Sequence, residues 1–318
     1  MTAKLHGAVV RWFATEARDL PWRDPRCSPW GVLVSEVMLQ QTPVVRVLPV
    51  WREWMERWPR AADLAAESPG EAVRAWGRLG YPRRALRLHA AATVIATEHD
   101  GELPDSEDGL LALPGVGGYT AAAVAAFAFG RRASVVDTNI RRVHARLVSG
   151  DALPAPALTA AERRLAEALL PDDDATSVRW NAGVMELGAL ICTARSPKCS
   201  MCPVADECAW RAAGEPPPSY VPKGQAWHGT DRQVRGAIMA VLRGASRPVP
   251  RVVLDGLATA EPVTAEPVTA LTEGSATSPE LARLHALAPA PEQLERCIAG
   301  LLADGLAVEL TGGLALPH

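Results

Sequence analysis

Apolar residues recur every three or four positions through most of residues 1–210, which is the spacing of helices that pack one face against a core. The first such stripe lies at the N-terminus and consists of Leu5, Val9, Trp12 and Phe13. Polar residues separate its members, so we interpret it as an amphipathic helix and not as a signal peptide. No convincing alternation with a period of two appears in this region. The pattern therefore predicts an all-α body.

Capping side chains mark the starts of several of these helices. Ser28 and Thr42 each precede a proline at a first helical position. Two further pairs have the spacing of capping boxes, namely Ser68 with Glu71 and Thr159 with Glu162. A later apolar stripe leads directly into a cysteine and consists of Trp180, Val184, Leu187 and Ile191. These signals support the helical interpretation.

The pattern changes at residues 214–229, whose four prolines and three glycines are typical of a linker. Beyond the linker, two apolar stripes predict helices, and two short apolar runs around Gly312 and Gly313 predict a hairpin. This order is that of a winged-helix module. Between the two helices, residues 260–269 repeat the sequence AEPVT within a stretch rich in alanine, proline and threonine, which predicts a disordered insertion over 258–290.

The composition argues against a membrane protein. The chain has 318 residues, which suggests roughly two domains and room for a small third one. No stretch approaches the ~20 apolar residues of a membrane-spanning helix, so we expect a cytoplasmic protein. The net charge of −3 does not by itself indicate a nucleic-acid partner. Basic charge comes almost wholly from arginine, because the only lysines are Lys4, Lys198 and Lys223.

Four of the six cysteines fall within seventeen residues, in the pattern C-x6-C-x2-C-x5-C: Cys192, Cys199, Cys202 and Cys208. In a cytosolic chain such clustering favours metal binding over disulfides. Four thiolates on a short loop can enclose a [4Fe-4S] cluster. Structural zinc is the alternative, but zinc sites usually have two separated C-x2-C pairs and this loop has one. The isolated Cys27 and Cys297 are expected to be ordinary small residues.

A glycine-rich turn precedes the alanine-rich helix over 121–129. Its sequence over 113–120, LPGVGGYT, predicts two short helices joined so that successive backbone N–H groups point outward at a helix N-terminus. Such a turn can hold a DNA phosphate without reading sequence, although a plain connection between helices is the alternative. About twenty residues later, Asp137 follows two valines in the sequence VVDTN. It is either an N-cap or a carboxylate placed beside the sugar of a bound strand.

Together, the turn, the VVDTN segment and the cysteine loop resemble the helix-hairpin-helix DNA glycosylases of the endonuclease III superfamily. Residues 30–42, WGVLVSEVMLQQT, resemble the signature of the adenine glycosylase branch. The resemblance covers about residues 8–211. It implies a mostly α fold: an N-terminal helix over 1–20 that packs with an iron–sulfur cluster subdomain over 134–213, and a six-helix barrel with the hairpin over 21–133. The linker over 214–229 and a winged-helix-like α+β module over 230–318 follow.

The resemblance implies hydrolytic removal of mispaired adenine, with Glu36 protonating the base and Asp137 stabilising the sugar cation. Glu36 is the only charge in residues 30–42, so burial should raise its pKa, as suits a general acid. Asp137 should stay ionised, which a helix N-terminus favours. Tyr119 is implied to lie next to the sugar cation, and Asn139 to help position the water.

The resemblance places the following residues against DNA: Trp22, Arg23, Gln41, Leu79, Tyr81, Gly115, Val116, Gly117, Thr120 and Arg141. Gln41 and Tyr81 would wedge into the base stack, while Trp22 and Arg23 would face the extruded base. A core aromatic is the alternative for Tyr81. Arg141, like Arg142 and Arg146, would line the phosphate path, for which a solvated helix face is the alternative.

The implied partner is double-stranded DNA with adenine opposite 8-oxoguanine or G, bound by a monomer. The chain departs from the family at Pro82, Thr138 and Ala182, which weakens the assignment of the base more than that of the reaction. No phenylalanine follows Phe129, so the Phe-Ser-His loop with which the family reads 8-oxoguanine is absent. No lysine lies between Lys4 and Lys198, which predicts a monofunctional enzyme. The alternatives are the same fold acting on another base, such as thymine, and an iron–sulfur redox-sensing DNA-binding regulator.

Overall fold

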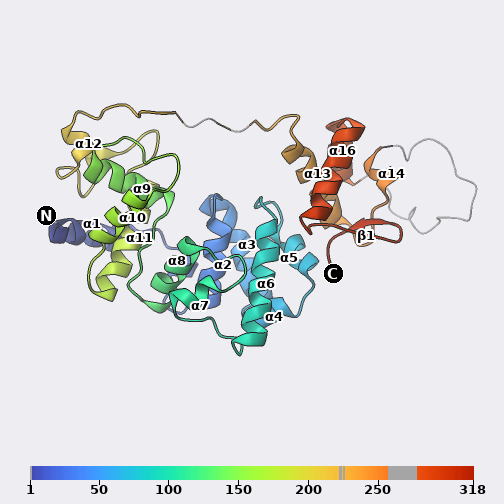
Figure 1. The fold of residues 1–318 in the computed structure, drawn as a ribbon, viewed down its shortest axis with the longest axis horizontal. Coiled ribbons are helices and arrows are strands. Elements are labelled where there is room, and N and C mark those ends of the chain that lie inside the picture. The colour runs from blue at the N-terminus through green and yellow to red at the C-terminus, as the bar shows by residue number, and fades with distance from the viewer. Residues whose placement is uncertain (1, 222–223, 225, 257–277) are drawn as a thin grey trace, which may run out of the picture. The chain divides into compact units, whose positions relative to one another are not determined.

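The computed structural model describes residues 2–221, 224, 226–256 and 278–318. The chain forms two compact units, each built from two stretches of sequence. One unit comprises Met1–Val37 with Glu102–Lys223, and the other comprises Met38–Gly101 with Gly224–His318. Most regular structure in the described ranges is helical, which confirms the predicted fold class (Figure 1). Within those ranges, no helix combines the length and apolar composition needed to cross a bilayer.

The first unit is helical throughout its described regular structure. Its elements are α1 (Thr2–Glu16), η1 (Pro21–Arg23), α2 (Pro29–Leu39), α7 (Glu107–Leu111), α8 (Gly118–Phe129), α9 (Thr138–His144), η2 (Ala145–Ser149), α10 (Ala160–Leu169), α11 (Asp174–Leu190), η3 (Cys199–Met201) and α12 (Ala209–Ala212). The last turn of α2 belongs to the second unit.

Small side chains allow close helix packing in this unit. Every residue of α8 from Thr120 to Ala126 is buried, and this helix packs against α7 and α11. The N-terminal helix α1 packs along α11 (Figure 1). A Cβ atom at Gly183 of α11 would lie 2.8 Å from Val9 Cγ1, so only glycine permits this approach.

In the second unit, residues 38–101 form a helical layer around buried tryptophans. Its helices are α3 (Val44–Arg57), α4 (Ala61–Ala65), α5 (Pro69–Trp76) and α6 (Arg83–Glu98). Trp54 packs edge-on against Trp58 and Trp76, with ring centroids 4.9 and 5.6 Å apart. Such aromatic pairs add specific geometry to the burial of large apolar area.

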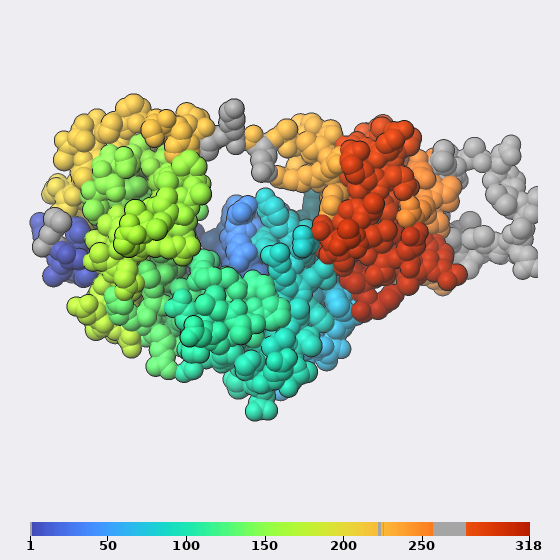
Figure 2. All heavy atoms as spheres, in the orientation of Figure 1, coloured from blue at the N-terminus to red at the C-terminus, as the bar shows by residue number. Residues whose placement is uncertain are grey.

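The C-terminal module has the predicted order of helices and hairpin. It consists of α13 (Asp231–Gly244), α14 (Arg251–Leu254), α15 (Pro279–Ala286), α16 (Pro291–Ala303), β1 (Val308–Leu310) and β2 (Gly313–Ala315). The two strands are antiparallel and pair Glu309 with Leu314. The described atoms of this module, orange to red, form a continuous packed body (Figure 2).

The range predicted for the disordered insertion, 258–290, extends too far toward the C-terminus, because part of it forms a helix. Its residues up to 277 lie outside the described residues, whereas α15 occupies part of the remainder. Ser278 caps this helix by accepting a hydrogen bond from the Leu281 N–H, Pro279 is its first residue, and Leu284 is fully buried. These helix signals were outweighed in the sequence by the low complexity that precedes them.

The module contacts α5 through backbone groups. The Gly70 N–H donates to the Pro317 carbonyl at 2.8 Å, and a Cβ atom at Gly70 would overlap this carbonyl. The Arg243 guanidinium donates to the Val73 carbonyl at 3.2 Å. Arg74 donates to the Ala245 carbonyl at 3.2 Å. Each of these hydrogen bonds ends on a specific backbone carbonyl, so together they fix the position of the module on α5.

The structure separates the predicted capping residues into two groups. Thr159 and Glu162 form the expected capping box, and the Ser28 hydroxyl accepts from the Gly31 N–H at 3.2 Å. Thr42 does not cap α3, and Ser68 does not cap α5 by its side chain. The Thr42 hydroxyl donates instead to the Leu79 carbonyl, a long-range contact that local spacing cannot predict.

Candidate active site

Glu36 lies on α2 in an entirely buried stretch from Trp30 to Met38. Its side chain is 5% exposed, and its Oε2 atom accepts a hydrogen bond of 2.7 Å from the Tyr119 hydroxyl on α8. Burial raises the pKa of Glu36 to about 7, although the Tyr119 hydrogen bond and the Arg23 charge lower it and the Asp137 charge raises it. The predicted burial of Glu36 and the predicted rise of its pKa are confirmed.

Asp137 is the N-cap of α9 and also faces the Asn139 side chain. Its Oδ1 accepts from the Ile140 N–H at 2.6 Å, and its Oδ2 accepts from Asn139 Nδ2 at 3.0 Å. Burial raises the pKa of Asp137, while these hydrogen bonds and the Arg142 charge act in the opposite direction. The structure therefore bears out the N-cap alternative. The other carboxylate oxygen, Oδ2, lies beside the Asn139 amide.

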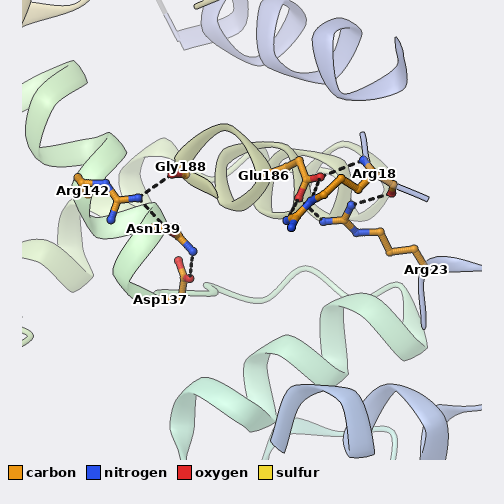
Figure 3. A network of polar contacts seen from close by, with 7 residues as sticks. All are labelled: Arg18, Arg23, Asp137, Asn139, Arg142, Glu186 and Gly188. Carbon is orange, nitrogen blue, oxygen red and sulfur yellow. Dashed lines mark hydrogen bonds and ion pairs between the residues drawn. The ribbon is translucent and has the colours of Figure 1, made fainter. Parts of the chain in front are cut away.

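Arg142 joins this aspartate network to the first cysteine of the loop. Its Nη2 donates to Asn139 Oδ1 at 2.8 Å and to the Gly188 carbonyl at 2.6 Å (Figure 3). Its Nε donates to the Cys192 carbonyl at 2.7 Å. A Cβ atom at Gly188 would lie 2.6 Å from the Asn139 Cβ. The close approach of α9 and α11 thus requires this glycine.

A buried ion cluster, which the sequence analysis missed, lies on the same helix α11. Glu186 is fully buried and accepts hydrogen bonds from Arg18 at 2.7 Å and from Arg23 Nη2 at 2.8 Å (Figure 3). Burial alone would raise the pKa of Glu186, but the two arginines outweigh it and hold this pKa at about 2. A glutamate within an apolar stripe was the available signal, as it was for Glu36. The Arg23 side chain, which was expected to face the base, is held by its ion pair with Glu186.

The four clustered cysteines lie on one short segment. Cys192 follows α11, Cys199 begins η3, Cys202 follows it, and Cys208 caps α12. Arg146 Nη1 donates to Cys192 Sγ at 3.3 Å, which suits a thiolate. Four sulfur donors beside a cation fit an iron–sulfur group. Among the described residues, no three His, Cys, Asp or Glu side chains are grouped closely enough to hold a single metal ion.

The turn between α7 and α8 presents open backbone. Gly115 has a φ of 77°, in the left-handed region that favours glycine. A Cβ atom at Gly117 or Gly118 would meet nothing within 4 Å, so an approaching group can reach the first N–H groups of α8. The side chains of Val116 and Thr120 are buried, which leaves only their backbone for such a contact.

Several residues that were expected to contact DNA have partners within the protein. Arg141 is 12% exposed and is held by Glu162 and by the Ala155 and Ala157 carbonyls, so its guanidinium is engaged within the protein. Arg142 and Arg146 are engaged in the contacts given above and are buried. Leu79 is 4% exposed and packs in the core of its own unit. Long arginine side chains on a short helix gave no sign of these internal acceptors in the sequence.

Other expected contacts remain available. Gln41 and Tyr81 are exposed, and Tyr81 at 50% is not the core aromatic of the alternative interpretation. Trp22, in contrast, is 7% exposed.

Comparison with known proteins agrees with these features. The model of the HhH-GPD superfamily of base excision DNA repair proteins matches residues 34–168, and that of the iron–sulfur binding domain of endonuclease III matches residues 192–208. An adenine DNA glycosylase of Mycobacterium tuberculosis is 52% identical over 248 residues, which cover 78% of this chain and 81% of that protein. The chain belongs to the adenine DNA glycosylase family.

A second relative and a solved structure also resemble this chain. The adenine DNA glycosylase of Mycolicibacterium smegmatis is 53% identical over 247 residues, 78% of this chain and 83% of that protein. Since this length exceeds the part of the chain before the linker, the match reaches beyond it. A solved thermostable thymine-DNA glycosylase has 29% identity and a TM-score of 0.59, covering 67% of this chain and 97% of that one. Membership of the family and the iron–sulfur segment are thus both established.

Proposed function

We propose that this chain hydrolyses the N-glycosidic bond of adenine mispaired with 8-oxoguanine or G in double-stranded DNA. The observation that carries the proposal is the buried Glu36, whose pKa lies near neutrality beside Asp137. Burial raises the pKa of both carboxyl groups, but Asp137 accepts hydrogen bonds from the Ile140 N–H and from Asn139, which favour its anion. Glu36 can thus supply the acid and Asp137 the anion. Protonation at N7 helps a purine to leave, which favours adenine over thymine as the base.

The reaction follows from the two carboxyl groups. Glu36 gives its proton to N7 of adenine, and the electron pair of the N-glycosidic bond leaves with the base. Asp137 stabilises the cationic sugar that remains, which is charge that develops only as the bond breaks. Water adds to the sugar carbon and loses a proton, and Asn139 helps to position this water. Tyr119 lies beside Glu36, to which its hydroxyl donates a hydrogen bond, and the charge of Asp137 acts on it as well.

DNA binding is proposed to use both backbone groups and side chains. The open turn at 115–118 would accept a phosphate through N–H groups of α8. Gln41 and Tyr81 would enter the base stack while the adenine is extruded. Trp22 and Arg23 would face the extruded base, with Arg23 held in place by Glu186.

The iron–sulfur group has a structural role in this proposal. When bound by the four cysteines, it would cross-link residues 192–208 into one fixed loop. Two arginines help to fix this loop. Arg146 donates a hydrogen bond to the Cys192 sulfur, and Arg142 donates one to the Cys192 carbonyl. We further propose that residues 134–213 form the cluster subdomain, on which residues 1–20 pack, and that 21–133 form the barrel.

Recognition of the partner base is proposed to be modest. Residues 230–318 contain no phenylalanine and therefore no Phe-Ser-His loop. A missing base contact typically costs ~1–3 kcal/mol, or roughly one to two decades of discrimination. We infer that adenine is removed opposite either G or 8-oxoguanine, with 8-oxoguanine only moderately preferred. The protein would act as a monomer.

The test is base release from synthetic duplexes under single-turnover conditions. Each duplex holds one adenine opposite 8-oxoguanine, G, C or T, and further duplexes hold T or U opposite G. Release of adenine from the first two duplexes supports the proposal. Release of thymine or uracil with no adenine would replace it with the thymine-type activity. Sequence-specific binding of one DNA site without base release would favour a regulator.

A further inference from the structure

Two exposed side chains of the second unit stand on strained backbone. Gln41 has a φ of 55° and Tyr81 a φ of 47°, in the left-handed region that residues with a Cβ atom rarely adopt. Such conformations cost of order 1–3 kcal/mol each and persist only where surrounding contacts impose them. Some group in this unit therefore holds both turns.

That group is the guanidinium of Arg84, in the first turn of α6. The residue is 6% exposed, although arginine is rarely buried this deeply. Its Nη1 donates to the Gln40 carbonyl at 2.6 Å and to the Met38 carbonyl at 3.2 Å. Its Nη2 donates to the Gly80 carbonyl at 3.1 Å. One planar group thus binds backbone next to Gln41 and next to Tyr81.

Further contacts tie the same two turns. Arg84 Nη2 donates to the Thr42 hydroxyl at 3.1 Å, and this hydroxyl donates to the Leu79 carbonyl at 3.2 Å. The guanidinium carbon lies 5.2 Å from the Trp76 ring centroid and 5.6 Å from the Tyr81 ring centroid. Burial lowers the pKa of Arg84 to about 10, so the group keeps its charge at neutral pH.

We propose that Arg84 is a positioning residue that sets Gln41 and Tyr81 in the conformation that enters the DNA stack. This inference rests on the wedge role given to these two side chains in the proposed function. The planar fork of arginine suits the task, because its donors have fixed relative directions and can bind several carbonyls at once. Arg84 itself contacts neither the base nor the reacting atoms.

Removal of the Arg84 guanidinium should slow the opening of the DNA stack without changing the pKa of Glu36. When Arg84 is removed, both turns can relax to unstrained conformations, and ordering them again opposes DNA distortion. Small displacements of positioning groups can cost about a hundredfold in rate. Glu36 and Asp137 keep their own partners, so the pH dependence of the excision rate is expected to stay the same.

The experiment measures stack opening and excision in the same duplex. A 2-aminopurine next to the adenine·G mispair increases its fluorescence when the neighbouring stack opens. Arg84→Met is compared with Arg84→Lys and with Arg87→Met. Arg87 is an exposed arginine three positions after Arg84 on α6. Circular dichroism melting of each variant controls for folding.

We expect Arg84→Met to open the stack and release adenine about ten- to a hundredfold more slowly than wild type. Arg84→Lys should recover part of both rates, and Arg87→Met should behave as wild type. If Arg84→Met does not fold, Thr42→Val decides, because it removes the hydroxyl that Arg84 and Leu79 share. Stack opening at the wild-type rate in the folded variants overturns the inference. If wild type itself releases no adenine, it is the proposed function that fails.

Discussion

The Tyr119 hydroxyl donates a 2.7 Å hydrogen bond to Oε2 of the buried Glu36. This contact joins α8 to α2 and lowers the pKa of Glu36, yet burial outweighs it and leaves that pKa at about 7. A proton is therefore held near neutrality by a carboxyl group that is otherwise shielded from water.

The variant Glu36→Gln should be inactive but more stable than wild type above pH 7. The folded pKa of about 7 is above the reference value of 4.5, so the folded state holds the proton more tightly. This stabilising effect is fully present below pH 4.5 and is lost as the pH rises through 7. At pH 8 the amide should gain up to about 3 kcal/mol relative to wild type.

Urea unfolding of both proteins at pH 5 and pH 8 measures this difference. A gain at pH 8 that shrinks at pH 5 supports a buried carboxyl with a raised pKa. An equal difference at both pH values would mean that Glu36 titrates as an exposed carboxyl.

The variant Asp137→Asn should lose base release while it keeps duplex binding. The amide cannot offset the positive charge that develops on the sugar, but it can still cap α9 through its oxygen. Single-turnover excision and gel-shift titration on an adenine·G duplex separate the two effects. Excision within tenfold of wild type would rule out the assigned role.

Much of the fold and of the chemistry was predictable because it depends on local patterns. The cysteine spacing, the glycine turn and the apolar segment around Glu36 each carry their signal within a few residues. The internal partners of Arg141 and Leu79, Glu162 and the core of the second unit, could not be predicted because they come from other parts of the sequence. Glu186 was missed for the same reason, since its arginines lie far away along the chain.

The variant Glu186→Gln should be strongly destabilised. It would leave Arg18 and Arg23 without their carboxylate in a buried site, and breaking such a cluster typically costs about 3–5 kcal/mol. The Arg23 charge would then act more strongly on Glu36, so the pKa of Glu36 and the pH of half-maximal excision should fall. Glu207→Gln, which breaks an exposed pair with Lys4, is the control and should change neither. If both variants have the same stability and the same pH of half-maximal excision, the buried Glu186 cluster contributes to neither property.

Borohydride trapping on abasic and adenine·G duplexes should give no stoichiometric protein–DNA adduct. A Schiff base needs an amine near the sugar, and no lysine lies between Lys4 and Lys198. Lys4 is paired with Glu207, and Lys198 is an exposed residue of the cysteine segment. Denaturing gels read the result, with a lysine-dependent bifunctional glycosylase as the positive control. A strong adduct that maps to residues 21–133 would contradict a monofunctional mechanism.

The most direct test of the central claim is the pH dependence of adenine release by wild type under single-turnover conditions, on a duplex with adenine opposite 8-oxoguanine. Because Glu36 must be protonated to act and its pKa is about 7, the rate constant should fall about tenfold per pH unit above that value. A rate that is unchanged between pH 6 and pH 9, with saturating enzyme at each pH, would show that Glu36 is not the proton donor.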